Sequence, residues 1–119
     1  MENSVPVFIQ IKEKIKDDIM SGIYAVGELI ISTTKIAKLY SVNPATAMKS
    51  VSMLQAEGIV YKKRGIGMCV AEGAKEAIIA ERKKNFYEGA VSDIVSEAKK
   101  LNIKKADLIK IVSGVKDYD

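Results

Sequence analysis

The residues of this 119-residue chain best suited to a chemical role are the consecutive cations Lys62, Lys63 and Arg64, in the stretch YKKRGIGMCV. Apolar, β-prone runs flank them at 59–61 and 68–70. This pattern predicts a β-hairpin whose turn uses the positive φ that glycine adopts freely. Cations at a hairpin tip can bind phosphates, and arginine suits the narrow minor groove of duplex DNA. The resulting DNA-binding candidates are Lys62, Lys63, Arg64 and Gly65.

A second stretch, NPATAMKSVSMLQAEG, has the punctuation of one compact helix from Pro44 to about Glu57. Asn43 can cap its first amides, Pro44 fits the first helical position, and Gly58 can end it. Its predicted core face is apolar at positions i, i+4 and i+7: Ala47, Val51 and Leu54. A helix of this length spans ~21 Å, and its N-terminal half can enter a major groove ~12 Å wide. We interpret it as a recognition helix with the DNA-binding candidates Asn43, Ala45, Thr46 and Lys49.

Other elements must hold the predicted hairpin and the predicted recognition helix in place. The apolar spacing predicts an amphipathic helix over Val5–Met20, and the run Leu29–Ile31 favours a brief strand. The hydroxyls of Ser32, Thr33 and Thr34 are typical of a helix start, so a second helix is expected through Tyr40. The same hydroxyls are candidates for phosphate contacts. We expect a mainly α (α+β) fold, with a winged helix-turn-helix DNA-binding domain at residues 1–72.

The remaining residues, 73–119, predict a helical tail. Helical patterns run from Ala74 to about Ala98 and from about Lys104 to Ser113, with Asn102 as a break. Its apolar stripe is too large for so short a segment to bury alone, and a second copy of the tail is the simplest partner. A ligand pocket is the alternative use of these side chains. The dimerisation candidates are Phe86, Tyr87, Ala90, Val91, Ile94, Leu108 and Ile109.

Composition excludes several kinds of chemistry. The chain has no histidine and a single cysteine, Cys69, so neither a Cys/His metal site nor a His-based triad is available. Cys69 lies in a β-prone run and is expected to be a small buried hydrophobe rather than a redox sensor. No apolar run is long enough to span a bilayer, and the first residues lack a signal-peptide pattern. We expect a cytoplasmic protein with no cofactor and no membrane contact.

The order and spacing of these elements, from about Val5 to Val70, resemble the DNA-binding domain of GntR-type bacterial transcription regulators. The residues that carry this resemblance are VNPATAMKS and AEGIVYKKRGIGMCV. The short tail resembles the YtrA-like subgroup, which implies a two-helix dimerisation segment and, often, repression of transporter operons. The resemblance also implies phosphate contacts near Ser32 and a wing at Lys62–Gly67 that approaches the minor groove.

Several positions depart from the family pattern. Ile31 and Thr34 stand where proline and arginine are usual, Met48 replaces a polar or basic residue, and Met68-Cys69 replaces Thr-Phe. An atypical operator is therefore expected.

The function that these features predict is a homodimeric regulator, a repressor, that binds a palindromic double-stranded DNA operator. The net charge of +4 is compatible with such a polyanion. A winged-helix module that binds another protein is the alternative. An enzyme is a third class, for which the chain offers no catalytic constellation. A small-molecule effector is possible but not indicated by any motif.

Overall fold

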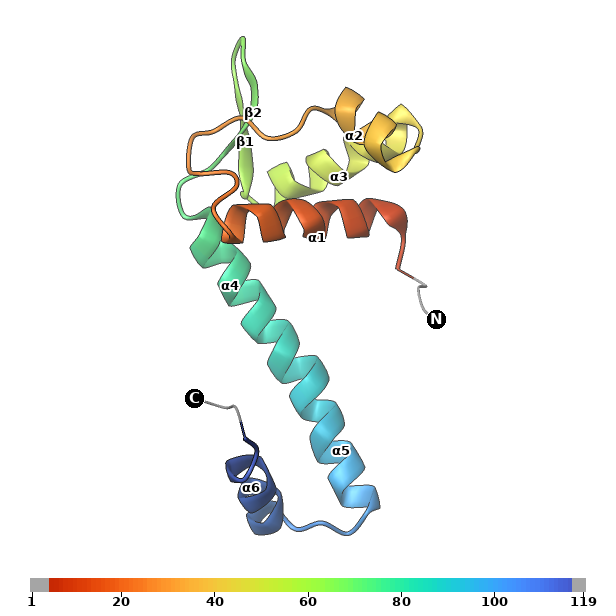
Figure 1. Ribbon diagram of the computed structural model, residues 1–119, viewed down its shortest axis with the longest axis vertical. Coiled ribbons are helices and arrows are strands. Elements are labelled where there is room, and N and C mark those ends of the chain that lie inside the picture. The colour runs from red at the N-terminus through yellow and green to blue at the C-terminus, as the bar shows by residue number, and fades with distance from the viewer. Residues whose placement is uncertain (1–4, 117–119) are drawn as a thin grey trace. The chain divides into compact units, whose positions relative to one another are not determined.

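The computed structural model (Figure 1) describes residues 5–116; the ends of the two expected domains, 1–4 and 117–119, lie outside the described residues. The chain divides into two compact units, and the boundary lies between Ala80 and Glu81. The fold is mainly helical with a small two-stranded sheet, as the sequence predicts.

The first unit contains a helix-turn-helix followed by a hairpin. Its elements are α1 (Val7–Met20), α2 (Thr33–Tyr40), α3 (Pro44–Ala56), β1 (Val60–Lys63) and β2 (Gly67–Val70). Helix α1 begins after Pro6, not at Val5 as predicted, because a residue that precedes proline avoids the α conformation. Helix α3 packs against α1 and α2, and the hairpin follows α3 (Figure 1).

The core of this unit lies between the helices and the base of the hairpin. Helix α1 buries Ile11, Ile15 and Ile19, four residues apart along one stripe. Helix α3 buries the three residues predicted to face the core: Ala47, Val51 and Leu54. The same cluster contains Ala74 and Ile78. The start of the helix after the hairpin therefore belongs to the first unit, which reaches past residue 72.

Side-chain caps set the start of both helices of the helix-turn-helix. Ser32 Oγ accepts a hydrogen bond from the Lys35 amide at 3.2 Å, and Asn43 Oδ1 accepts one from the Thr46 amide at 2.9 Å. Ser41 turns the chain between the helices in the left-handed conformation, with φ 52° and ψ 46°. The predicted caps are therefore confirmed, and they begin α2 and α3 where expected.

The wing is an antiparallel hairpin in which Val60 pairs with Val70 and Lys63 with Gly67. Its tip closes through a hydrogen bond from the Ile66 amide to the Lys63 carbonyl, at 2.9 Å. Gly67 has a φ of +133°, and a Cβ atom added there would lie 2.9 Å from Leu29 Cδ1. Glycine at this position therefore satisfies both the backbone and a close approach.

The run Leu29–Ile31 does not form the strand that the sequence predicts. It makes one isolated bridge, between Leu29 and Cys69, and the Ile30 amide donates to the Met68 carbonyl at 3.0 Å. The next amide, that of Ile31, points away from β2, as successive amides of an extended chain alternate, and donates to the Tyr24 hydroxyl at 3.2 Å. The segment makes a single bridge before the chain reaches Ser32, the N-cap of α2.

A cluster of charges joins α1 to the end of α3. Lys12 Nζ lies 2.7 Å from Glu57 Oε2, and Lys16 Nζ lies 2.7 Å from Glu57 Oε1. Lys16 is completely buried, and Glu57 is the C-terminal cap residue of α3. The position of α3 is therefore tied to α1 by charge as well as by apolar packing.

Beyond the hairpin the chain forms α4 (Ala74–Asn85), a π-helical segment η1 (Phe86–Val91), α5 (Ser92–Lys100) and α6 (Lys105–Ser113). The sequence predicts a largely helical segment from Ala74 to about Ala98, which the structure confirms; the π-helical turns of η1 are a detail that the pattern does not indicate. Asn102 ends α5 with a φ of 58°, at the predicted break. Within the second unit, Ala98 is buried.

Candidate nucleic-acid interface

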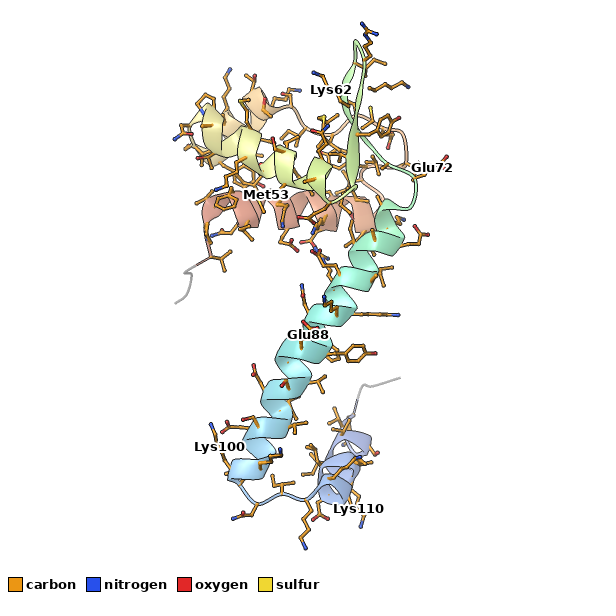
Figure 2. The ribbon with its side chains drawn as sticks, turned by 180° about the vertical axis from the view of Figure 1, so that it is seen from behind. Met53, Lys62, Glu72, Glu88, Lys100 and Lys110 are labelled. Carbon is orange, nitrogen blue, oxygen red and sulfur yellow. The ribbon has the colours of Figure 1, made fainter. Side chains whose placement is uncertain are left out.

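The wing presents its cations to solvent while its base is anchored in the core. All the predicted wing residues are exposed: Lys62, Lys63, Arg64 and Gly65. Figure 2 shows the side chains of the hairpin, with Lys62 labelled. At the other end of the strands, Val60 and Val70 are buried. The cations are therefore available to phosphates on a hairpin that the core holds in place.

The N-terminus of α2 carries the predicted hydroxyl cluster. Ser32 and Thr34 are exposed, and Thr33 is half-buried. The Ser32 oxygen accepts the capping bond, so its O–H can donate to a phosphate at the same time. Sequence reasoning missed Lys35, an exposed cation in the first turn of α2. The sequence could have indicated Lys35, because a cation three residues after a helix cap lies beside the end of the helix that binds anions.

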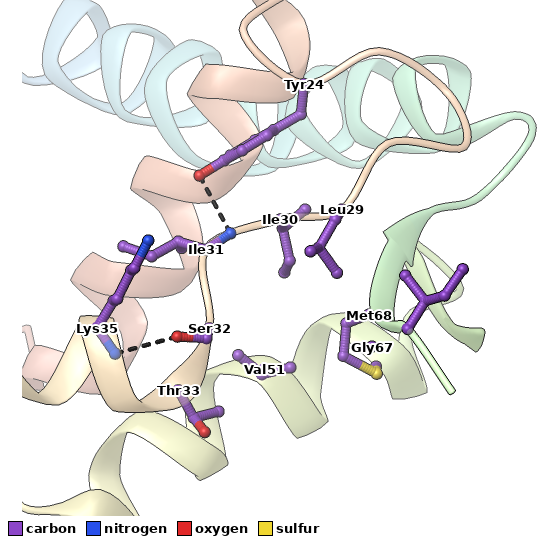
Figure 3. Close-up of a pocket in the computed structure, with 11 residues that line it drawn as sticks. Tyr24, Leu29, Ile30, Ile31, Ser32, Thr33, Lys35, Val51, Gly67 and Met68 are labelled. Carbon is purple, nitrogen blue, oxygen red and sulfur yellow. Dashed lines mark hydrogen bonds between the residues drawn. The ribbon is translucent and has the colours of Figure 1, made fainter. Parts of the chain in front are cut away.

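A hollow of about 690 Å³ lies between the start of α2 and the wing (Figure 3). Ser32, Thr33 and Lys35 line it on the helix side, and Gly67 and Met68 line it on the wing side. Two of the predicted groups, the α2 hydroxyls and the wing, therefore border the same depression.

The predicted residues of α3 differ in what they can reach. Ala45 and Lys49 are exposed, Thr46 is half-buried, and the side chain of Asn43 is engaged in capping. The Lys49 ammonium lies 4.0 Å from the centroid of the Phe8 ring, in a cation–π contact with α1. Phe8 was missed from the sequence because its distance from Lys49 along the chain leaves no local signal.

The Glu57 carboxylate differs electrostatically from the exposed residues. Burial raises its pKa, but the hydrogen bonds and charges of Lys12 and Lys16 outweigh burial and leave the pKa below its usual value. Both lysines are buried and bound to Glu57. They therefore hold α3 against α1 and do not belong to the exposed charge of the domain.

The predicted dimerisation residues fall into two groups. Exposed side chains form the larger group: Phe86, Tyr87, Ala90, Ile94 and Ile109. Val91 and Leu108 are half-buried. Leu108 lines a hollow of about 640 Å³ between α5 and α6, together with Ile94, Leu101 and Ile111. Much of the apolar surface of the second unit is therefore uncovered in a single chain.

Other sites are not indicated in residues 5–116. That part of the chain has no group of three or more His, Cys, Asp or Glu side chains that could hold a metal. None of its helices is long and apolar enough to cross a membrane. Cys69 is 1% exposed on β2, which agrees with the prediction of a buried small hydrophobe.

A helix-turn-helix followed by a basic wing is one architecture of DNA-binding domains. Residues 9–70, which span these elements from α1 to β2, match the family described as bacterial regulatory proteins, gntR family. The chain belongs to the GntR family. This GntR chain carries the winged helix-turn-helix domain of transcription regulators, followed by a helical C-terminal segment.

Individual relatives agree with this assignment. The GntR chain is 30% identical over 96 residues to the HTH-type transcriptional repressor YtrA of Bacillus subtilis, a match that covers 81% of this chain and 73% of YtrA. A solved GntR-family structure from Bacteroides thetaiotaomicron is 34% identical, with a TM-score of 0.76, and the match covers 91% of this chain and 94% of that one. Both of these relatives are named as transcription regulators.

One solved relative contains DNA. It is the AraR DNA-binding domain in complex with an operator, 27% identical with a TM-score of 0.55. The match covers 60% of this GntR chain and 86% of that one.

Proposed function

We propose that this GntR protein is a homodimeric repressor that binds a palindromic operator in the cytoplasm. The observation that carries the proposal is the exposure of α3 and of the wing cations on one anchored domain. The similarity to YtrA, which is named a repressor, supports repression over activation. The resemblance to the YtrA-like subgroup further favours a transporter operon as the regulated target.

In this proposal α3 enters the major groove with its N-terminal half. Ala45 lets the backbone approach closely, and Lys49 supplies positive charge beside the groove. The hydroxyls of Ser32, Thr33 and Thr34, together with Lys35, bind backbone phosphates at the start of α2. Asn43 and Thr46 hold the first turn of α3.

The wing contributes at the neighbouring minor groove. Arg64 lies at the tip, next to Gly65, and suits a narrow groove of strong negative potential. Lys62 and Lys63 add phosphate contacts along the hairpin. Because cations supply much of the affinity, binding weakens steeply with salt.

The second unit supplies the dimer contact. Its exposed apolar side chains include Phe86, Tyr87, Ile94 and Ile109. A second copy that covered them would remove a large apolar surface from water. Dimerisation would then place two α3 helices about 34–36 Å apart, one turn of DNA, on a palindrome.

Anisotropy titrations of the full chain test the proposal, with duplexes from upstream of its own gene as probes. We expect salt-dependent binding. Arg64→Ala is expected to lower the affinity, and to reduce the magnitude of the slope of log K against log salt by about one. Lys105→Ala, an exposed cation on α6, is the matched control and leaves the slope unchanged. If the protein shows no salt-dependent binding to any of these duplexes, the proposal is contradicted.

A protein-interaction module is the second candidate, and the exposed apolar surface of the second unit favours it. Light scattering separates the two candidates. A homodimer without any added partner supports the regulator, and a monomer that binds no DNA supports the interaction module.

A further inference from the structure

One face of α3 is unusual for a helix that enters a major groove. Ala45, Met48 and Ser52 occur at i, i+3 and i+7, which places them within about 60° of one another at 3.6 residues per turn. All three are exposed, and Met48 is 57% exposed. The opposite face is formed by Ala47, Val51 and Leu54, which are buried.

The N-terminal half of this face, the part proposed to enter the groove, carries no charged side chain and no amide; the exposed amide of Gln55 follows about two turns after Met48 on the same side. Side chains that recognise guanine or adenine by paired hydrogen bonds are arginine, lysine, asparagine and glutamine. The nearby cation, Lys49, lies about 40° from Ala45 and about 100° from Met48 around the helix, and its ammonium lies over the Phe8 ring. Because Lys49 contacts Phe8, the largest side chain that the N-terminal half of this face offers to a base edge is the thioether of Met48.

We propose that Met48 makes the α3 face specific for thymine, by packing against the 5-methyl group in the major groove. The inference rests on the proposed function, in which α3 enters that groove. The thymine methyl is the apolar feature of the major-groove edges, and small side chains at Ala45 and Ser52 let the helix come close to it. Methionine is flexible and polarisable, so it can follow the methyl surface closely.

The size of the effect follows from burial of one methyl group. Loss of such a contact lowers affinity about three- to fourfold at each half-site, and roughly tenfold for two half-sites of a dimer. The preference therefore affects sequence choice more than total affinity, most of which comes from phosphate contacts.

Uracil replacement tests this with the unaltered protein. Duplexes are first enriched from a random library with the full chain, and each thymine is then replaced by uracil, which removes only the methyl group. We expect one thymine per half-site whose replacement lowers affinity three- to fourfold. Equal affinity for all thymine and uracil duplexes overturns the inference, and salt-dependent binding to them would still support the proposed function.

Variants assign the effect to Met48. In Met48→Ala the sensitive thymine and its uracil form bind equally well, whereas Lys105→Ala, an exposed change on α6 and outside the proposed interface, keeps the difference. In Met48→Arg the preferred base at that position changes to guanine, because arginine pairs with its major-groove edge. Methyl sensitivity that survives Met48→Ala, or a thymine preference that survives Met48→Arg, also overturns the inference. Failure to enrich any duplex contradicts the proposed function itself.

Discussion

Lys16 Nζ lies 2.7 Å from Glu57 Oε1, and the lysine side chain has no exposed surface. This contact joins α1 to the C-terminal end of α3, and Lys12 binds the other carboxylate oxygen at 2.7 Å. A buried ammonium is costly to desolvate, so its partner has to remain charged and in place. The helix proposed to enter DNA is thus held at its far end by an ion cluster.

Replacing Lys16 tests the energy of this cluster. We expect Lys16→Met to lower the free energy of unfolding by about 2–3 kcal/mol, less than the loss of an isolated buried pair, because Lys12 still binds Glu57. Urea denaturation measures the change. Lys14→Met is the control, since Lys14 pairs with Asp18 at the surface, and it has little effect. Equal stability of Lys16→Met and the wild type would show that the Lys16–Glu57 attraction does no more than offset the cost of desolvating Lys16.

The depressed pKa of Glu57 predicts a dependence on pH. A carboxyl group whose pKa is lower in the folded state stabilises the fold above its unfolded pKa of about 4.3, and this contribution disappears as pH falls through the folded pKa. We therefore expect Glu57→Gln to be less stable than the wild type at neutral pH. The difference shrinks below pH ~4, as measured by urea unfolding across a pH series. A difference that stays constant with pH contradicts the assigned shift.

The contact between Phe8 and Lys49 predicts a coupling energy between two helices. In a double-mutant cycle with Phe8→Leu and Lys49→Met, we expect about 0.5–1 kcal/mol of coupling in the free energy of unfolding. Leucine keeps most of the apolar packing and removes the aromatic ring. A cycle of Phe8→Leu with Lys38→Met, an exposed cation of α2, is the control and gives no coupling. Absence of coupling between Phe8 and Lys49 rejects the contact.

Asn43 separates capping from DNA binding. Asn43→Ala removes the acceptor of the Thr46 amide and is expected to cost about 1 kcal/mol of stability. Asn43→Asp keeps the cap, so its thermal unfolding stays close to that of the wild type. Its DNA affinity falls nevertheless, because the new negative charge would face phosphates. If Asn43→Asp binds DNA as the wild type does, the start of α3 does not approach the duplex.

The exposed residue Ile109 tests dimerisation through the second unit. Its side chain is 55% exposed, so Ile109→Glu preserves the fold of the single chain. We expect a monomer by light scattering and weaker operator binding, because a charge cannot be buried in an apolar interface. Lys105→Glu, also on α6, is the control and remains dimeric. A dimeric Ile109→Glu places the interface elsewhere.

Much of the local structure was predictable because local residues determine it. Asn43 and Pro44 start α3, Ser32 starts α2, and glycines permit the turn of the wing. Each of these depends on contacts within a few residues along the chain. The family resemblance rests on the same local patterns, and so does the expectation that Arg64 stands at the wing tip.

The strand prediction for Leu29–Ile31 was wrong, and one detail of the segment after the wing was not indicated by the sequence. Leu29–Ile31 has β-prone residues, but it makes a single bridge, to Cys69, before Ser32 caps α2. The largely helical segment predicted after the wing is helical in the structure, but it contains the π-helical segment η1 (Phe86–Val91), whose sequence carries no proline to mark it. Helical periodicity alone does not distinguish these backbone forms.

The sequence by itself determined the helix caps, the basic hairpin and the apolar stripes, because each is a pattern of near neighbours. Only the tertiary structure decided which charges are used internally and which remain for a partner. Lys12 and Lys16 resemble any other amphipathic-helix lysines in sequence, yet they are bound to Glu57, while Lys49 contacts Phe8. These pairings join residues far apart in the chain, and they exist only because core packing brings α1 and α3 together.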